Sequence, residues 1–265
     1  MSRSVFAILL VLVSACGREG RTAATAGAQR LVDLSHEYAA DSIFWPTAEG
    51  FKLDVVSDGM TPQGYYYAAN NFSGAEHGGT HLDAPVHFAK GRMSVEQIPV
   101  DQLVGPASVI DVSSKAAGTP DYQLTVAELQ AWEQAHGPIT GSIVLVRTDY
   151  SKRWPDAERY LGTTERGDAA VAKLHFPGIH PDAASWLAER HVKAVGIDTA
   201  SIDYGQSKLF ETHRALYDKN IPGLENLANL DQLPATGATL VALPMKIKGG
   251  SGAPLRAIAM LPQGR

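Results

Sequence analysis

Eight short runs rich in β-branched or aromatic residues most constrain the fold of this chain. Three helical segments are interspersed with them: one with a capping box at Thr125 and Glu128, one starting at Pro181, and one over 209–219. Because strands outnumber helices in mixed order, we expect an α/β domain whose helices cover a β-rich, mixed, curved sheet. The eight runs are 31–34, 51–56, 65–72, 108–112, 143–147, 194–197, 239–243 and 255–261.

The first sixteen residues differ from the rest of the chain. Arg3 precedes an unbroken apolar run from Val5 to Val13, and small residues then lead to Cys16. The run is too short to span a bilayer, and the pattern is that of a secretory signal peptide. The four residues ending at Cys16 also resemble a bacterial lipobox, and Cys16 is the only cysteine. We therefore expect residues 1–16 to be a signal peptide with a lipid anchor at Cys16; a plain cleaved signal is the alternative.

The remaining chain divides into a linker and one domain. Residues 17–29 are small and polar without hydrophobic period, which predicts a flexible linker, and residues 30–265 show no repeat that would mark a second domain. We expect a single catalytic domain that is exported, either periplasmic or held at a membrane only by the lipid on Cys16. The formal net charge of -5, without a basic stripe, excludes nucleic acid as a partner.

The segment 76–88 carries the chemistry. His77 and His81 are four residues apart, but Gly78, Gly79 and Pro85 rule out a helix, so the segment is extended or looped. In extended chain, side chains two residues apart point the same way, which places His81 beside Asp83, and the glycines let His77 fold back toward them. Such a cluster can consist of ordinary polar turn residues, but three histidines and an aspartate within eleven positions favour a metal site.

This ligand set also indicates the metal and its use. Two imidazoles and a carboxylate suit Zn²⁺ or Mn²⁺ and leave coordination positions open for water, which is typical of a catalytic metal. His87 alternates onto the same side and could transfer a proton. We therefore predict His77, His81 and Asp83 as metal ligands and His87 as the catalytic residue.

The segment resembles a family signature. His77, Gly79, Thr80, His81, Asp83, Ala84, Pro85, His87 and Phe88 match the pattern H-x-G-T-H-x-D-A-P-x-H-F of the metal-dependent cyclase family, which includes bacterial kynurenine formamidases and isatin hydrolases. The resemblance continues through residues 33–36, 45–46, 144–148, 198–203, 221–234 and 243–256. It therefore covers essentially the whole expected domain.

The resemblance implies a swivelling β/β/α cyclase-like fold, a homo-oligomer and hydrolysis of an amide bond. It also implies that His213 and Glu225, an acid twelve residues further on, complete the metal site. The family includes enzymes that resemble single-metal hydrolases, but because Glu225 is an acid we expect capacity for two ions, so one or two bind per chain. For His213 a solvent-facing position on its helix, and for Glu225 a loop cap, are the alternatives.

Three more residues are candidates for substrate binding. His36 lies near the expected pocket, and Phe44 and Trp45 could line a flat aromatic pocket or belong to the core. The expected activity is that of a metal-dependent amidohydrolase, acting on carbon–nitrogen bonds other than peptide bonds. Metal-bound hydroxide would attack a small aromatic or cyclic amide, by isatin-type ring opening or aryl formamide hydrolysis. The alternative is a surface lipoprotein that binds a metal or solute without turnover.

Overall fold

The computed structural model describes residues 30–262. The predicted signal peptide with its lipobox-like end and the predicted linker fall in residues 1–29, outside the described residues. Within residues 30–262, no helix is long and apolar enough to cross a membrane.

The described residues form twelve strands and seven α-helices. The strands are β1 (Leu31–Asp33), β2 (Lys52–Met60), β3 (Tyr66–Ser73), β4 (His81–Asp83), β5 (Val104–Asp111), β6 (Gln123–Leu124), β7 (Ile143–Arg147), β8 (Gly178–Ile179), β9 (Ala194–Ile197), β10 (Gly223–Glu225), β11 (Thr239–Pro244) and β12 (Gly252–Met260). The helices are α1 (Val100–Leu103), α2 (Ser113–Ala116), α3 (Val126–His136), α4 (Ala157–Leu161), α5 (Asp168–Val171), α6 (Pro181–Glu189) and α7 (Glu211–Tyr217).

Seven of these strands close into a mixed β-barrel. The main sheet runs β1-β12-β11-β5-β7-β9-β10-β4, and β4 also pairs with β12, so the sheet returns on itself. The pairs β5–β7, β7–β9 and β9–β10 are parallel, and the other pairs around the barrel are antiparallel. The mixed, β-rich α/β architecture is therefore confirmed, and closure goes beyond the curved sheet that the sequence predicts.

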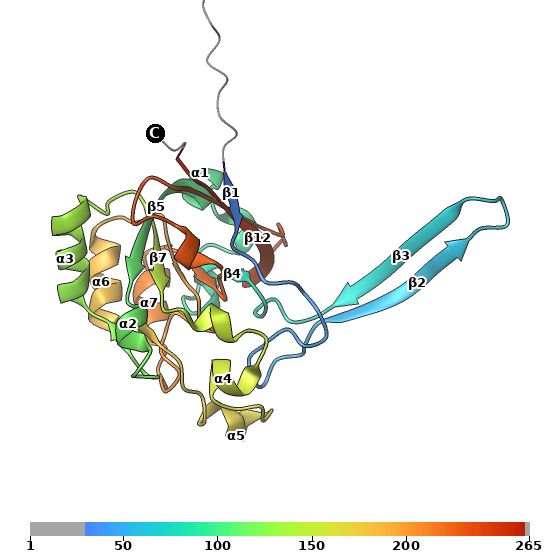
Figure 1. The fold of residues 1–265 in the computed structure, drawn as a ribbon, viewed down its shortest axis with the longest axis horizontal. Helices are drawn as coiled ribbons and strands as arrows, with labels where there is room; N and C mark the ends of the chain where they lie inside the picture. The colour runs from blue at the N-terminus through green and yellow to red at the C-terminus, as the bar shows by residue number, and fades with distance from the viewer. Residues whose placement is uncertain (1–29, 263–265) are drawn as a thin grey trace, which may run out of the picture.

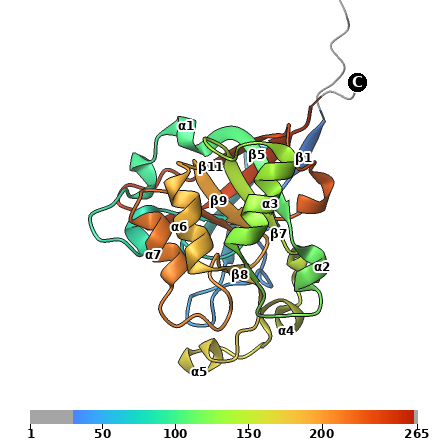
Figure 2. The same cartoon turned by 90° about the vertical axis from the view of Figure 1, so that its left-hand side faces the viewer.

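Two apolar layers hold the barrel and its helices together. In β7, Ile143 and Leu145 pack into the barrel interior cluster, whereas Val144 and Val146 pack into the cluster beneath the helices. All four are fully buried, because helices cover the outer face of this parallel part of the sheet. Figure 2 shows α3, α6 and α7 together over this side of the barrel.

The helix signals in the sequence are confirmed. The side chain of Glu128 accepts hydrogen bonds from the backbone and hydroxyl of Thr125, at 2.8 Å each, and α3 begins directly after this cap. Helix α6 begins at Pro181 as expected, and α7 lies within the predicted 209–219. Helix α6 packs against α7, and α7 carries His213.

A long hairpin stands apart from the barrel. Strands β2 and β3 pair only with each other among the described strands. Figure 1 shows this hairpin, which we call the arm, projecting far from the body of the molecule.

Candidate metal centre

The short strands β4 and β10 hold the centre of the site. β4 lies between β10 and β12, where it closes the barrel, and its residues are fully buried. His81 and Asp83 project from the same side of β4, as the extended chain requires. In the antiparallel pair β4–β10, His81 stands opposite Glu225, which brings an acid from 144 residues away beside the histidine.

The Gly78–Gly79 pair permits the turn ahead of β4. A Cβ atom on Gly78 would lie 2.0 Å from the ring of Phe44, and Gly79 has a φ of +56°, in the left-handed region. Neither position therefore accepts a larger residue without rearrangement. The side-chain amide of Asn226 stabilises the turn by donating a hydrogen bond to the Gly79 carbonyl at 2.8 Å.

One candidate ligand group consists of His77, Asp83 and His87. Nδ1 of His77 is 2.6 Å from Oδ1 of Asp83, and Nε2 of His87 is 3.9 Å from Oδ2 of the same carboxylate. The rings of His77 and His87 stack with centroids 3.8 Å apart. The 3₁₀ turn Pro85–His87, directly after β4, returns His87 toward Asp83. The expected proximity of these three residues is thus present in the fold.

A second candidate group consists of His81, Asp83 and Glu225. Nε2 of His81 is 3.1 Å from Oδ1 of Asp83 and 3.4 Å from Oε2 of Glu225. Nδ1 of His81 pairs with the Gly79 carbonyl at 3.0 Å, which orients the ring. Asp83 belongs to both groups, so its carboxylate lies where the two groups meet.

His213 reaches the same centre from α7. Its Nε2 lies 3.1 Å from Oε1 of Glu225 and 3.4 Å from Oδ2 of Asp83. Its Nδ1 lies 2.5 Å from Oδ2 of Asp203. A carboxylate on the far nitrogen of a histidine fixes the ring and makes the near nitrogen more basic. His213 is therefore brought to the site, although it belongs to neither three-residue ligand group.

Four further residues lie around the centre, and the sequence analysis assigned them no role: Glu76, Asp203, Tyr217 and Ser251. The hydroxyl of Tyr217 donates a hydrogen bond to Oδ2 of Asp83 at 2.9 Å, and Asp203 orients His213. Ser251 contacts Nε2 of His77 at 2.9 Å and donates a hydrogen bond to Glu76 at 2.7 Å. Asp203 and Ser251 lie in segments of family resemblance, which could have marked them; nothing in the local sequence singles out Tyr217.

Burial and the neighbouring charged groups shift the pKa values of the central residues in opposite directions. Burial would raise the pKa of Asp83, but the charge of His77 and hydrogen bonds from His213, His77 and His81 hold it well below its usual range. Burial would lower the pKa of His213, but hydrogen bonds with Asp203, Asp83 and Glu225 raise it well above the usual value. The buried acids thus require compensating positive charge in the centre.

The pKa of His87 is lowered, whereas that of His213 is raised. The pKa of His87 is lowered to about 4, because burial, helped by the nearby His77, His213 and His81, outweighs the opposing effect of Asp83. His87 is therefore a neutral imidazole at neutral pH, able to accept a proton.

The residues fit a divalent cation. Nε2 of His81 is buried without a hydrogen-bond partner, although it faces two carboxylates. An unpartnered buried acceptor beside two buried acids is what a cation would satisfy, leaving the imidazoles neutral as metal ligands must be. Imidazole and carboxylate donors suit zinc and manganese.

A cavity of about 280 Å³ opens over these ligands. Phe44 and Trp45 both line it, as the aromatic-pocket hypothesis expects, and Phe88 and Phe210 add two further rings. His77 and His87 are the partly exposed members of the centre, with 23% and 29% of the side chain accessible, so they face the cavity. The floor of the cavity consists of buried groups: His81, Asp83, His213 and Glu225.

His36 is not among the residues that line this cavity. Its ring stacks on Trp154 at 4.2 Å between centroids, and its backbone amide donates to the Thr80 hydroxyl at 2.9 Å. It therefore supports the strand that follows Gly79 from outside the cavity. The structure does not bring it to the position expected of a substrate-binding residue.

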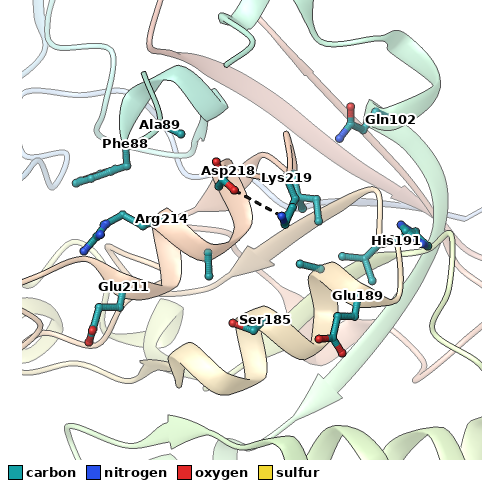
Figure 3. Close-up of a pocket in the computed structure, with 14 residues that line it drawn as sticks. Phe88, Ala89, Gln102, Ser185, Glu189, His191, Glu211, Arg214, Asp218 and Lys219 are labelled. Carbon is teal, nitrogen blue, oxygen red and sulfur yellow. Dashed lines mark ion pairs between the residues drawn. The ribbon is translucent and has the colours of Figure 1, made fainter. Parts of the chain in front are cut away.

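A larger hollow of about 990 Å³ lies beside α6 and α7 (Figure 3). Its wall carries charged side chains such as Arg214, Asp218 and Lys219, and an ion pair of 3.5 Å joins Asp218 to Lys219. Neither of the two candidate ligand groups lines it, so it does not compete with the smaller cavity as the site of chemistry. Phe88 lines both hollows.

Known proteins resemble this chain in sequence and in fold. A 39% identical relative, the isatin hydrolase of Roseibium aggregatum, aligns over 76% of this chain and 77% of its own length. The kynurenine formamidase of Paracidovorax citrulli is 34% identical over 70% of this chain and 76% of its own. An isatin hydrolase solved with the product analogue thioisatinate superposes with a TM-score of 0.80 at 33% identity, covering 89% of this chain and 94% of that one.

The model of the Cyclase family, described as "Putative cyclase", matches residues 32–204 and so includes His77, His81, Asp83 and His87. With more than half of the chain matched and relatives above 30% identity over most of it, this protein belongs to the Cyclase family, together with isatin hydrolases and kynurenine formamidases.

Proposed function

We propose that this protein is a metal-dependent amidohydrolase that cleaves a carbon–nitrogen bond of a small aromatic or cyclic amide. The observation that carries the proposal is that two ligand groups sharing Asp83 lie at the floor of an aromatic-lined cavity of about 280 Å³. That volume is at the small end of ligand pockets, which span about 300–1,000 Å³. It suits one or two fused rings better than a peptide.

The ligands proposed for the cation are His77, His81, Asp83 and Glu225, with His213 adjoining. Zn²⁺ or Mn²⁺ fits this donor set, and one or two ions can be held because Asp83 belongs to both groups. When bound, the cation polarises a carbonyl and makes water more acidic.

His87 is the proposed proton carrier. Its imidazole lies at the partly exposed side of the centre and faces the cavity, where it can take the proton of the attacking water. It then returns that proton to the departing nitrogen, because an amide nitrogen leaves poorly as an anion. The same residue thus acts first as base and then as acid.

We propose that the aromatic residues lining the cavity select the substrate. Phe44, Trp45 and Phe210 line the cavity, and Trp45 and Phe210 pack with centroids 6.2 Å apart. Flat apolar surfaces favour a planar aromatic ring held next to the ligands. Isatin-type ring opening and aryl formamide hydrolysis both present such a ring with an amide at its edge, and the relatives named isatin hydrolase favour the former.

The test is turnover of an amide panel by the purified full chain. We expect hydrolysis of isatin or an aryl formamide with Zn²⁺ or Mn²⁺, loss of activity on removal of the metal by a chelator, and recovery on adding it back. Product appearance by liquid chromatography is the measurement. Tight binding of these compounds without product would instead support the non-catalytic binding protein that the sequence left open.

Export is proposed as the setting of this activity. The apolar run 5–13 and the lipobox-like residues ending at Cys16 support it, and they imply substrates outside the cytoplasm.

A further inference from the structure

A carboxylate, a hydroxyl and an imidazole lie in line at the edge of the metal centre. Oγ of Ser251 donates a hydrogen bond to Oε2 of Glu76 at 2.7 Å, and this Oγ also lies 2.9 Å from Nε2 of His77. Nδ1 of His77 faces the other way, 2.6 Å from Oδ1 of Asp83. Glu76 and Ser251 belong to neither candidate ligand group, so their contacts with the centre call for a different role.

The hydrogen atoms in this line of contacts can point in only one direction. An ionised carboxylate has no hydrogen to give, so Glu76 accepts, and the single hydroxyl hydrogen of Ser251 is committed to it. The lone pairs left on Oγ of Ser251 can only accept, which requires Nε2 of His77 to carry a hydrogen. In a neutral imidazole the free lone pair is then on the other nitrogen. Nδ1 of His77, the atom beside Asp83, is therefore the one that can bind a cation.

The two buried histidines of the centre are oriented the opposite way round. Nδ1 of His81 lies 3.0 Å from the Gly79 carbonyl, which can only accept, so that nitrogen carries the hydrogen and Nε2 has the free lone pair. Nδ1 of His213 is held in the same way by Asp203, at 2.5 Å from Oδ2. His77 differs from both, because its outer nitrogen is Nε2 and its partner there is a serine hydroxyl.

Two glycines make room for these contacts on either side of Ser251. A Cβ atom on Gly250 would lie 2.9 Å from Oε1 of Glu76, and one on Gly252 would lie 2.6 Å from Cε1 of His77. A side chain at either position would therefore displace the carboxylate or the ring, and glycine is the residue that permits so close an approach. The backbone of residues 250–252 thus fits closely around both groups that Ser251 joins.

Holding this segment against β4 does not require the serine side chain. The backbone amide of Ser251 donates its own hydrogen bond to Oε2 of Glu76, at 3.0 Å, and its carbonyl accepts one from the amide of Ala84 at 2.8 Å. Both contacts persist whatever side chain stands at 251. What the hydroxyl adds is the link between Glu76 and His77, and among the residues 30–262 no cation pairs with that carboxylate.

We propose that Glu76 and Ser251 are positioning residues that fix the tautomer and ring orientation of His77. This histidine then binds the cation through Nδ1, whereas His81 and His213 bind through Nε2. The inference rests on the proposed function only in requiring a divalent cation at the centre, and it does not depend on the substrate. A partner on the far nitrogen of a ligating histidine orients the ring and makes it more basic, and Glu76 strengthens this effect through Ser251.

The first test measures the affinity of the full chain for Zn²⁺ by competition with a chromophoric chelator, without substrate. We expect about 10–100-fold weaker binding for Ser251→Ala, which removes the hydroxyl but leaves the backbone contacts in place. Ser251→Thr, which restores a hydroxyl, should recover most of the affinity. The matched control Ser185→Ala, at an exposed serine of α6, should bind as wild type does. Equal affinities for wild type and Ser251→Ala would overturn the proposal.

Glu76→Gln separates the direction of the hydrogen bonds from contact alone. Glutamine keeps the size of the side chain, but its amide can donate as well as accept, so the hydroxyl hydrogen of Ser251 is free to turn toward His77. The tautomer is then no longer fixed, and we expect an affinity for Zn²⁺ between those of wild type and Ser251→Ala. The exposed Glu189→Gln is the matched control. Wild-type affinity in Glu76→Gln would show that the carboxylate has no part in positioning His77.

The third test identifies the ligating atom. Long-range ¹H–¹⁵N spectra of the Zn²⁺-loaded protein, labelled with ¹⁵N-histidine, distinguish imidazoles bound through Nδ1 from those bound through Nε2. We expect a single Nδ1-bound imidazole in wild type, whose resonances shift or broaden in Glu76→Gln while those of the Nε2-bound imidazoles stay in place. A wild type in which every bound imidazole uses Nε2 overturns the proposal, and so does a wild type that takes up no Zn²⁺.

These outcomes are distinguishable from failure of the proposed function. A wild type that shows the Nδ1-bound imidazole but hydrolyses no amide of the panel would contradict the proposed function and support this inference. Turnover by a protein whose bound imidazoles all use Nε2 would contradict this inference and support the proposed function.

Discussion

Glu225 stands directly opposite His81 across the β4–β10 pair, with 3.4 Å between Oε2 of the acid and Nε2 of the histidine. The register of this strand pair therefore brings Glu225 of β10 next to His81 of β4 in the metal centre. Because Glu225 is buried, only the neighbouring histidines and the backbone amide of Ile202 lie close enough to compensate its charge within the described residues.

Replacing Glu225 by Gln should lower metal affinity. The amide keeps the size of the side chain but removes a charge next to His81, and we expect about 10–100-fold weaker binding, as for other changes around metal ligands. Metal analysis after dialysis against defined Zn²⁺ or Mn²⁺ is the measurement, with the exposed Glu189→Gln as control. A wild type that holds at most one ion, together with unchanged metal content and activity in the variant, would remove Glu225 from the ligand set.

Replacing His87 by Ala should separate catalysis from metal binding. If His87 carries the proton, turnover falls by about 10²–10⁴-fold while metal content stays at the wild-type level. Since His87 also lies close enough to His77 and Asp83 to ligate, loss of metal in the variant would assign it to the ligands instead. His136→Ala, at an exposed residue at the end of α3, is the matched control and should change neither quantity.

The stability of the fold should depend on His36 in acid. Burial lowers the pKa of His36 to about 4, below the usual value of 6.5, so the unfolded chain binds its proton first as pH falls. Stability is therefore lost between about pH 6.5 and 4. The variant His36→Phe, which can keep the stacking on Trp154, should lose less stability than wild type between pH 7 and 4.5 in urea unfolding. Parallel losses in the two proteins would contradict this, and His136→Phe should behave like wild type.

Replacing Cys16 by Ser should release the protein from membranes. The prediction rests on the lipobox-like end at Cys16, where lipid would be attached. Fractionation of cells with an antibody against the folded domain measures it. A variant that stays with the membrane would show that the apolar run 5–13 anchors the chain without lipid.

The features of the site that depend on neighbouring residues could be predicted from the sequence. Gly78, Gly79 and Pro85 exclude a helix whatever the surroundings, and an extended chain necessarily puts His81 and Asp83 on one side. Likewise Thr125 with Glu128, and Pro181, carry their own helix-start signals, so α3 and α6 begin where expected. These features depend only on neighbours a few residues away.

The short strands β4 and β10 could not be predicted in this way. β4 and β10 have three residues each, too few for a hydrophobic period, and each is a strand because its backbone pairs with distant segments. The same holds for Tyr217 and Ser251, whose contacts with Asp83 and His77 arise from the packing of α7 and of the segment before β12. His36 stacks on Trp154 outside the cavity that the candidate ligands line, because nearness in the family pattern does not fix which side of a strand a neighbour occupies.

The sequence by itself determined which residues could bind a metal and that they lie in an extended segment, because residue chemistry and backbone sterics are local properties. The family resemblance named His213 and Glu225, but only the tertiary structure showed how they reach Asp83, that Asp203 orients His213, and that β2 and β3 stand apart from the barrel. These outcomes depend on barrel closure, which sets β4 beside β10 through long-range hydrogen bonding that no short stretch of sequence encodes.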